Sequence, residues 1–460
     1  MFTAWLEINC LINSGNLKNL RRILVLSAVI LLSISLHAQA QVGVSGAFKS
    51  RYIRTANKGS LADFSGAVSY GYLKYQKKAN EWLSIGGQVN GLLHYGLDNI
   101  IKRDAQTGAG PIFEANLWNP RYLDGRFAGV LSQLYADLNF GDHTFTIGRF
   151  LRQTPIINPE PWPFPNAMQG IWYQYNEKRF KFQLGVIDQI SPRFTGRFDN
   201  IGETIGLAAT GINESGLPST YTGNVDSDYL LVSNFNIQLN EQFSIDAWNY
   251  YVDNVFNTFL IEPSLKFDGE LTLKGMFIYQ SRVGNGGNDN AALSYVSEGT
   301  NAVYFGLRAE KKFGNSALQF NVSVIGPDGR LQLPREWGLE PFYTFQRRTR
   351  VEGQRSVTSL MAKWTSNWEK EKSNTTFFTS VGWHKTPAPE DVVKNKLGLP
   401  PHLHWDASVK YAGKKGGVNR FSAELYLAIR SLTGSELTNE SFRINRADFF
   451  HSDLILAYTF

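Results

Sequence analysis

The end of the sequence alternates strictly between apolar and mixed positions. Between residues 449 and 460, every second side chain belongs to one almost wholly apolar face: Phe450, Ser452, Leu454, Leu456, Tyr458 and Phe460. The intervening positions carry the charged and polar groups. A period of two predicts a β-strand with one face in an apolar medium. Because a terminal aromatic would have to be buried in a soluble domain, we expect this strand to face lipid and to pair with the first strand.

The same alternation recurs along residues 41–460, for example in residues 83–95 and 421–429, and about eighteen strands can be counted. Tight turns join the strands on one side, and the long connections fall on the other, at residues 96–129, 151–169, 189–227, 281–301, 327–355, 385–403 and 431–448. This asymmetry predicts an all-β fold, a transmembrane antiparallel β-barrel of about eighteen strands with short periplasmic turns and long external loops. A soluble propeller or solenoid is the alternative, but the sequence has no fixed repeat period.

Two strands lead to more detailed expectations. In residues 130–140 the alternation places Val130 and Ser132 on the outward face together with Leu134, and Gln133 on the inward face. Pro263 lies inside an apolar strand, where it cannot donate a hydrogen bond to a neighbour. A closed barrel has no free edge to accommodate such a residue, so we expect a β-bulge at Pro263.

The first forty residues differ from the rest. Lys18, Arg21 and Arg22 precede a short apolar run, and an Ala-Gln-Ala sequence ends at residue 40, so residues 1–40 are predicted to be a secretory signal peptide. The only cysteine of the 460 residues lies in this leader, which excludes disulfides and Cys-ligated metals from residues 41–460. The leader contributes a net charge of +2, three basic residues minus one acidic, so the formal charge of +6 falls to +4. This mild charge does not indicate a nucleic-acid partner.

Barrel size and inner face together predict a pore. Barrels of sixteen to eighteen strands leave an aqueous channel, and an inner wall of Ser, Gln, Asn, Thr, Lys and Glu requires water beside it. The first strand begins within a few residues of position 41, which leaves no room for a folded plug. We therefore expect a diffusion channel for small hydrophilic solutes that catalyses no reaction and needs no cofactor or metal.

The first candidate for a constriction is the loop at residues 151–169. It contains five prolines, which stiffen the loop, and Trp162 and Phe164, which give it aromatic surface for packing inside the lumen. Arg149 and Arg152 at its start are candidate residues of the solute pathway. The alternative is a rigid external cap that contacts lipopolysaccharide.

The second candidate is the loop at residues 327–355, which contains the segment from Leu331 to Phe345, LQLPREWGLEPFYTF. This segment, and Ala-Met-Gln-Gly at residues 167–170, resemble the OprD family of substrate-specific outer-membrane porins. The resemblance implies a channel of about eighteen strands with two inward-folded loops, a row of basic side chains along one wall and an acidic patch opposite. It also implies passage of amino acids, small carboxylates and related solutes.

Several charged residues are candidates for the solute pathway. Arg335 and Glu336 could pair in a partly dry constriction, where a guanidinium holds a carboxylate with two parallel hydrogen bonds. Inward strand positions add a row of cations that would favour a passing anion, namely Lys266, Lys274, Arg308, Lys363 and Lys410. In contrast, we expect Arg347, Arg348 and Arg350 to lie outside the lumen, solvated or bound to lipid phosphates.

An enzymatic or surface-binding barrel is the remaining alternative. His94 could pair with Asp98 and His384 with Asp391, but neither pair has an identifiable nucleophile. His402 and His404 share one face of an extended segment, without an evident third metal ligand. A surface-binding barrel would use loop aromatics such as Trp118 and Trp162. The expected location is the outer membrane of a Gram-negative bacterium, with membrane lipid and lipopolysaccharide around the barrel. Phe460 resembles the terminal signal that the barrel-assembly machinery reads.

Overall fold

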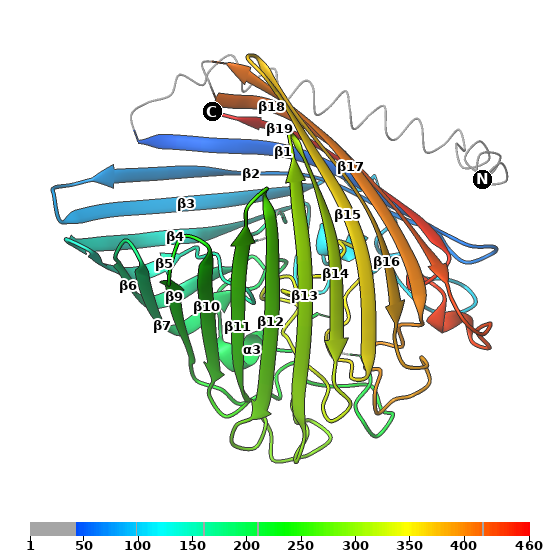
Figure 1. Ribbon diagram of the computed structural model, residues 1–460. Helices are drawn as coiled ribbons and strands as arrows, with labels where there is room; N and C mark the ends of the chain where they lie inside the picture. Colours follow the sequence, from blue (N-terminus) through cyan, green and yellow to red (C-terminus); the bar gives the residue numbers. More distant parts are fainter. Residues whose placement is uncertain (1–42, 98, 160–161, 209–210, 416–417) are drawn as a thin grey trace.

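The computed structural model describes residues 43–460 except 98, 160–161, 209–210 and 416–417, so the predicted leader lies outside the described residues (Figure 1). The described chain forms one closed antiparallel sheet. Its strands are β1 (Val44–Asn57), β2 (Phe64–Lys78), β3 (Leu83–His94), β4 (Phe127–Phe140), β5 (His143–Phe150), β6 (Ala167–Asn176), β7 (Phe180–Ser191), β8 (Asp199–Asn200), β9 (Leu230–Gln238), β10 (Phe243–Val252), β11 (Phe256–Phe267), β12 (Leu271–Arg282), β13 (Asn301–Phe313), β14 (Ser316–Ile325), β15 (Val357–Lys370), β16 (Ser373–Lys385), β17 (His402–Lys415), β18 (Val418–Leu432) and β19 (Phe449–Thr459).

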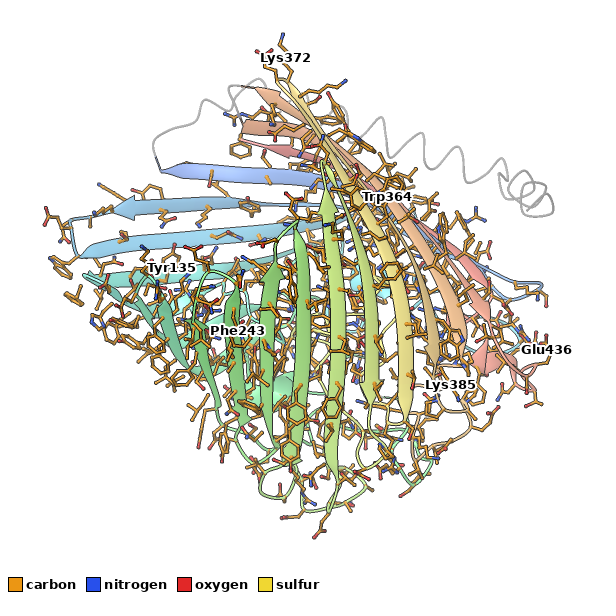
Figure 2. The ribbon with its side chains drawn as sticks, in the orientation of Figure 1. Tyr135, Phe243, Trp364, Lys372, Lys385 and Glu436 are labelled. Atoms are coloured by element: carbon orange, nitrogen blue, oxygen red, sulfur yellow. The ribbon has the colours of Figure 1, made fainter. Side chains whose placement is uncertain are left out.

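The predicted eighteen-stranded transmembrane barrel is confirmed. The two-residue strand β8 pairs only with the end of β7, so eighteen strands make up the wall. Short turns of two to four residues join the strands at one end, and long loops join them at the other. Figure 2 shows the two ends on the hairpin of β15 and β16, with Lys372 in a tight turn and Lys385 at the loop end. Two loop-end connections are short, at residues 58–63 and 253–255.

The barrel closes between its first and last strands, as the alternation at residues 449–460 predicts. The β1–β19 ladder runs without interruption from Ala47↔Thr459 to Asn57↔Phe449. Gly46 and Phe460 then exchange two backbone hydrogen bonds of 3.0 Å. The Phe460 ring covers Gly46 so closely that a Cβ at this position would lie 2.4 Å from it. The terminal aromatic therefore forms part of the seam, the junction between β1 and β19.

The outward positions are apolar and exposed, as a lipid-facing surface requires. Examples are Leu73, Val89, Leu307 and Phe320, each more than half exposed. Within the described chain no helix is both long and apolar enough to cross a membrane. The helical segments are single turns: η1 (Glu114–Asn116), α3 (Ile201–Thr204) and η2 (Glu440–Phe442).

Two strand-level expectations are wrong. The β3–β4 register shifts opposite Gln88, because β4 accommodates one extra residue there. This bulge turns Val130 and Ser132 inward, where both are buried, while Leu131 takes the outward position. The bulge expected at Pro263 does not occur. The register with β10 and β12 is the same on both sides of Pro263, and the ladder to β12 instead lacks two pairs.

The inner wall carries apolar clusters beside charged side chains. From β6 to β13, a hydrophobic core joins inward strand residues to loop residues, including Trp172, Ile187, Trp248, Tyr250, Leu260, Ile278 and Tyr304 from the wall, and Ile156, Ile157, Leu331, Trp337 and Phe342 from the loops. The expected polar inner wall is therefore found on only part of the circumference. The apolar part of the wall gives the inward loops a surface to pack on.

Candidate functional site

The loop between β14 and β15, residues 326–356, folds into the barrel. Trp337 is fully buried, and its indole N–H donates to Thr204 Oγ1 at the end of α3 over 2.8 Å. Phe342 stacks on the inward ring of Tyr304 with 4.5 Å between ring centroids. A buried indole requires a hydrogen-bond acceptor, and this one finds it on a second loop. The two prolines of the segment, Pro334 and Pro341, restrict the backbone around these anchors.

The loop between β5 and β6 lies against it. This loop spans residues 151–166, because Ala167 already belongs to β6. Asn158 accepts from Leu339 N over 3.2 Å, and its own N–H donates to Trp337 O over 3.2 Å. The Trp162 ring lies between the guanidinium groups of Arg51 on β1, 4.7 Å away, and Arg193, 5.4 Å away. The loop thus reaches from β5 to inward residues of β1, four strands away along the wall, which places it inside the barrel.

Six loops surround a cavity of about 620 Å³ at this level. Its described lining contains eight cationic side chains and no carboxylate: Arg193, Arg335, Arg347, Arg348, Arg350, Lys396, Arg430 and Arg446. The remaining lining is largely apolar and includes Ile112, Phe113, Trp162, Phe194, Leu207, Leu339, Leu399 and Phe442. The cavity therefore has a strongly cationic part next to an apolar part.

Several of these cations are held by backbone carbonyls instead of carboxylates. Arg446 donates to Leu397 O over 2.9 Å and to Ser441 O over 2.7 Å. Arg430 donates to Arg446 O over 2.8 Å. Carbonyl dipoles satisfy the N–H groups and fix the guanidinium planes, but they do not neutralise the charge. Burial, together with the nearby Arg335, lowers the pKa of Arg446 to about 10, which leaves Arg446 charged at neutral pH.

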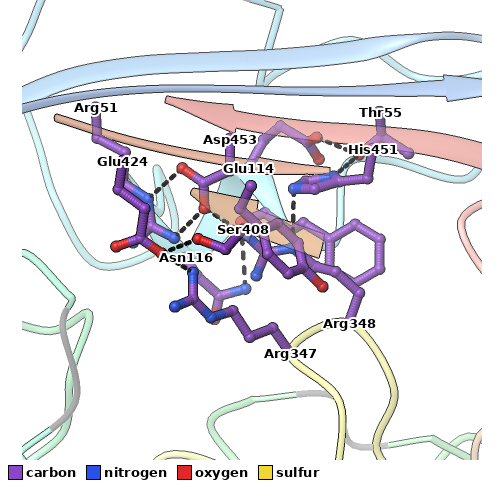
Figure 3. Close-up of polar contacts among 12 residues, drawn as sticks. Arg51, Thr55, Glu114, Asn116, Arg347, Arg348, Ser408, Glu424, His451 and Asp453 are labelled. Atoms are coloured by element: carbon purple, nitrogen blue, oxygen red, sulfur yellow. Dashed lines mark hydrogen bonds and ion pairs between the residues drawn. The ribbon is translucent and has the colours of Figure 1, made fainter. Parts of the chain in front are cut away.

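Below the cavity, a charged cluster joins loop 326–356 to the seam of the barrel (Figure 3). Asp453 on β19 accepts from Arg51 on β1 over 2.9 and 2.5 Å, and from Arg348 of the loop over 2.8 Å. Arg348 also donates to His451 Nε2 over 2.8 Å. Arg347 pairs with Glu424 on β18 over 2.6 Å. One carboxylate, that of Asp453, thus serves two buried guanidinium groups.

Solved structures share this architecture. Acinetobacter baumannii OccAB4 superimposes with a TM-score of 0.65 at 13% identity, covering 92% of this chain and 98% of that one. Acinetobacter baumannii OccAB3 gives 0.66 at 11%, over 91% and 98%, and Pseudomonas aeruginosa OccK8 (OprE) gives 0.64 at 14%, over 91% and 98%. The chain has the fold of the OprD-type porins. The resemblance seen in the sequence is confirmed at the level of the fold. No family model and no curated protein matches the sequence.

In this porin fold, the expected pairing of Arg335 with Glu336 does not form. Arg335 instead pairs with Glu352, and Glu336 accepts hydrogen bonds from the backbone N–H groups of Gly206 and Leu207. Adjacent residues of an irregular loop point in different directions, so sequence proximity misled the prediction. Burial raises the pKa of Glu336 to about 7. Burial also acts to raise the pKa of Glu352, but the Arg335 guanidinium brings it below its usual value.

Lys274 and Arg308 both lie on the inner wall, as expected, and they are cross-strand neighbours. Lys274 pairs with Glu262 over 2.7 Å, and Arg308 donates to Asn321 Oδ1 over 2.7 Å. The Arg308 guanidinium also stacks on the ring of Tyr343 at 4.3 Å. The other cations of the expected row occupy inward positions by the same alternation, namely Lys266, Lys363 and Lys410.

Arg149 and Arg152, next to loop 151–166, lie on different sides of the barrel wall. Arg152 points back into the barrel and donates to Thr146 Oγ1 over 2.6 Å. Arg149 pairs across the ladder with Leu134, a 60% exposed outward residue, so it lies on the outer face of the loop-end rim. Strand alternation explains this placement, because Arg149 follows the outward Ile147 by two positions. Arg149 therefore faces away from the inner wall of the barrel.

The expectation that Arg347, Arg348 and Arg350 lie outside the lumen is wrong, because all three line the internal cavity. The sequence reasoning also overlooked Lys49 and Arg51, which share the inward face of β1 with Ala47 and Ile53. The period-two pattern could have revealed Lys49 and Arg51. No comparable signal existed for loop cations such as Lys396 and Arg446, whose positions depend on how six loops pack.

In the described chain no group of three or more His, Cys, Asp or Glu side chains could hold a metal ion. His384 contacts Ser359 Oγ over 2.9 Å and Gln346 over 3.1 Å, whereas Asp391 pairs with Lys394.

His404 contacts Thr349 over 2.5 Å, and His402 contacts Pro400 O over 2.8 Å. The expected partner of His94, Asp98, lies outside the described residues. Trp118 and Trp162 are buried or half-buried among neighbouring side chains instead of being displayed for stacking on a surface ligand.

Proposed function

We propose that the protein is an outer-membrane diffusion channel that prefers small anionic solutes. The observation that carries this proposal is the cavity of about 620 Å³, whose described lining holds eight cations and no carboxylate. A cluster of fixed charges of one sign between low-dielectric walls concentrates solutes of the opposite sign. The porin fold of the structural neighbours supports a channel, and the predicted signal peptide supports passage to the outer membrane, where lipid and lipopolysaccharide would surround the barrel.

The pathway runs from the cavity toward β1. Arg347 and Arg348 of the loop lead to the inward face of β1, where Lys49 and Arg51 lie next to Lys410 of β17. Asp453 and Glu424 pair with three of these five cations, and the positive charge that remains along the row favours a passing carboxylate. The apolar part of the cavity suits solutes whose anionic group is attached to a hydrocarbon body. Amino acids are also expected to pass, but less well, because the described lining offers no carboxylate for their ammonium group.

Single-channel recording in a planar bilayer under a salt gradient tests this proposal. We expect discrete conductance steps, a reversal potential that shows anion selectivity, and partial block by added aliphatic or aromatic carboxylates. Arg350→Gln should reduce selectivity, because Arg350 lines the cavity, and Arg149→Gln on the outer rim is the matched control. The absence of conductance would refute the channel. Cation selectivity, or equal effects of the two substitutions, would refute the anion pathway.

A further inference from the structure

The wall of the barrel is interrupted beside Pro263. The β11–β12 ladder contains Ile261↔Phe277 and Ser264↔Lys274, but the two pairs between them are missing. Gly275 lies opposite the proline, and a Cβ built on it would be 3.5 Å from Pro263 Cγ. Pro263 has no N–H, so the Gly275 carbonyl receives no hydrogen bond from it. Within a membrane no water is at hand to replace that bond.

The outward side chains around this gap provide no hydrogen-bond donor for the Gly275 carbonyl. A depression of about 790 Å³ lies there, and the outward residues around it are apolar: Phe243, Pro263, Leu265, Leu273, Leu307, Phe320 and Val322. A partner for the Gly275 carbonyl therefore has to come from inside the barrel.

Tyr343 of loop 326–356 supplies that partner. Its hydroxyl lies 3.1 Å from Gly275 O and 2.8 Å from the Glu262 carboxylate, and these two acceptors share its hydrogen. The rest of the residue is fixed as well. Its N–H donates to the Tyr304 hydroxyl over 3.2 Å, and Arg308 donates to its carbonyl oxygen over 3.3 Å.

We propose that Tyr343 is a positioning residue, which latches loop 326–356 to the gap that Pro263 creates in the wall. If the loop left the lumen, the Gly275 carbonyl would lose its inner partner and Glu262 would lose a donor, and this cost holds the loop in place. The latch lies directly beside Lys274 and Arg308 on the inner wall. The inference depends on the proposed channel function only where conductance is the readout.

A double-mutant cycle tests the latch in single-channel recordings. Tyr343→Phe removes one hydroxyl, and we expect transitions between conductance levels to become about fivefold more frequent, the factor that one neutral hydrogen bond provides. Pro263→Ala restores an N–H opposite Gly275, so Tyr343→Phe should have a clearly smaller effect in that background. Tyr250→Phe is the matched control: its buried hydroxyl accepts from Ile156 of the other inward loop, and its effect should not depend on Pro263. Additive effects of Pro263→Ala and Tyr343→Phe would overturn the proposal.

A labelling experiment gives the same information without conductance. The described chain has no cysteine, and Thr344 beside the latch is 1% exposed. In a Thr344→Cys barrel, a water-soluble maleimide should react slowly, and about fivefold faster when Tyr343→Phe is added. Slower migration after boiling on a denaturing gel would show that each variant is folded. Equal labelling rates in folded barrels would overturn the latch, whether or not the protein conducts.

Discussion

The substitution Asp453→Asn removes the carboxylate at the seam of the barrel. Asp453 is 1% exposed, its Oδ1 accepts from Arg51, and its Oδ2 accepts from both Arg51 and Arg348. An asparagine can place its oxygen at only one of these two positions, so its NH₂ group then faces a guanidinium donor. Loss of one partner of a buried ion pair typically costs about 3–5 kcal/mol, because the remaining charges stay buried. We expect a loss of unfolding free energy in this range.

The assay is urea unfolding of the detergent-folded barrel, followed by tryptophan fluorescence. Asp391→Asn is the control, since the Asp391–Lys394 pair is about one-third to one-half exposed and contributes little. The same Asp453→Asn variant, reconstituted in a bilayer, should become more anion-selective, because it removes a negative charge from beside two arginines. A loss below about 1 kcal/mol would refute the reasoning, since it would mean that water or other groups already compensate the two cations.

Two further predictions concern loop 326–356. Trp337→Phe should lower the free energy of unfolding of the barrel by about 1–3 kcal/mol, because it removes the hydrogen bond to Thr204 and leaves a small cavity. The control Trp383→Phe, at an outward position, should have little effect. Burial raises the pKa values of Glu336 and Glu340 from 4.5 to about 7. Each carboxyl therefore favours the docked loop by about 3 kcal/mol below pH 4.5, and this contribution disappears as the pH rises through 7. Transitions between conductance levels should become more frequent from pH 5 to pH 8, and Glu336→Gln should flatten that dependence. An unchanged frequency would contradict the assignment.

The features that the sequence predicts correctly are those governed by strand periodicity. The alternation at residues 449–460 places Asp453 inside and Leu454 outside, and the structure agrees. The same rule fails at Val130, where a bulge in β4 shifts the register by one residue. A bulge leaves little trace in a pattern of apolar and polar residues, because either phase of the alternation remains plausible.

The candidate site was less predictable because most of it lies on loops. Lys274 and Arg308 occupy strand positions, and periodicity alone places them on the inner wall. Arg335 pairs with Glu352 seventeen positions away in the same loop, and Glu336 and Arg348 have partners on another loop and on β19; no local pattern specifies these contacts. The segment that resembles the OprD family indicated the importance of this loop, but the identity of each partner depended on the packing of the loops against one another.

The seam also constrains the order in which the protein can fold. Arg51 and Asp453 are separated by 402 positions, so their contact cannot form until almost the entire chain has been synthesised. Until then β1 is an open edge, and β19 becomes a second one as soon as it forms. Open edges are prone to pair with other chains. Pairing of strands that are far apart in the sequence is intrinsically slow, so the open sheet has to be protected from aggregation until the barrel closes. The Arg51–Asp453 ion pair forms only in a closed barrel of correct register, so it stabilises a contact that the chain can make only late in folding.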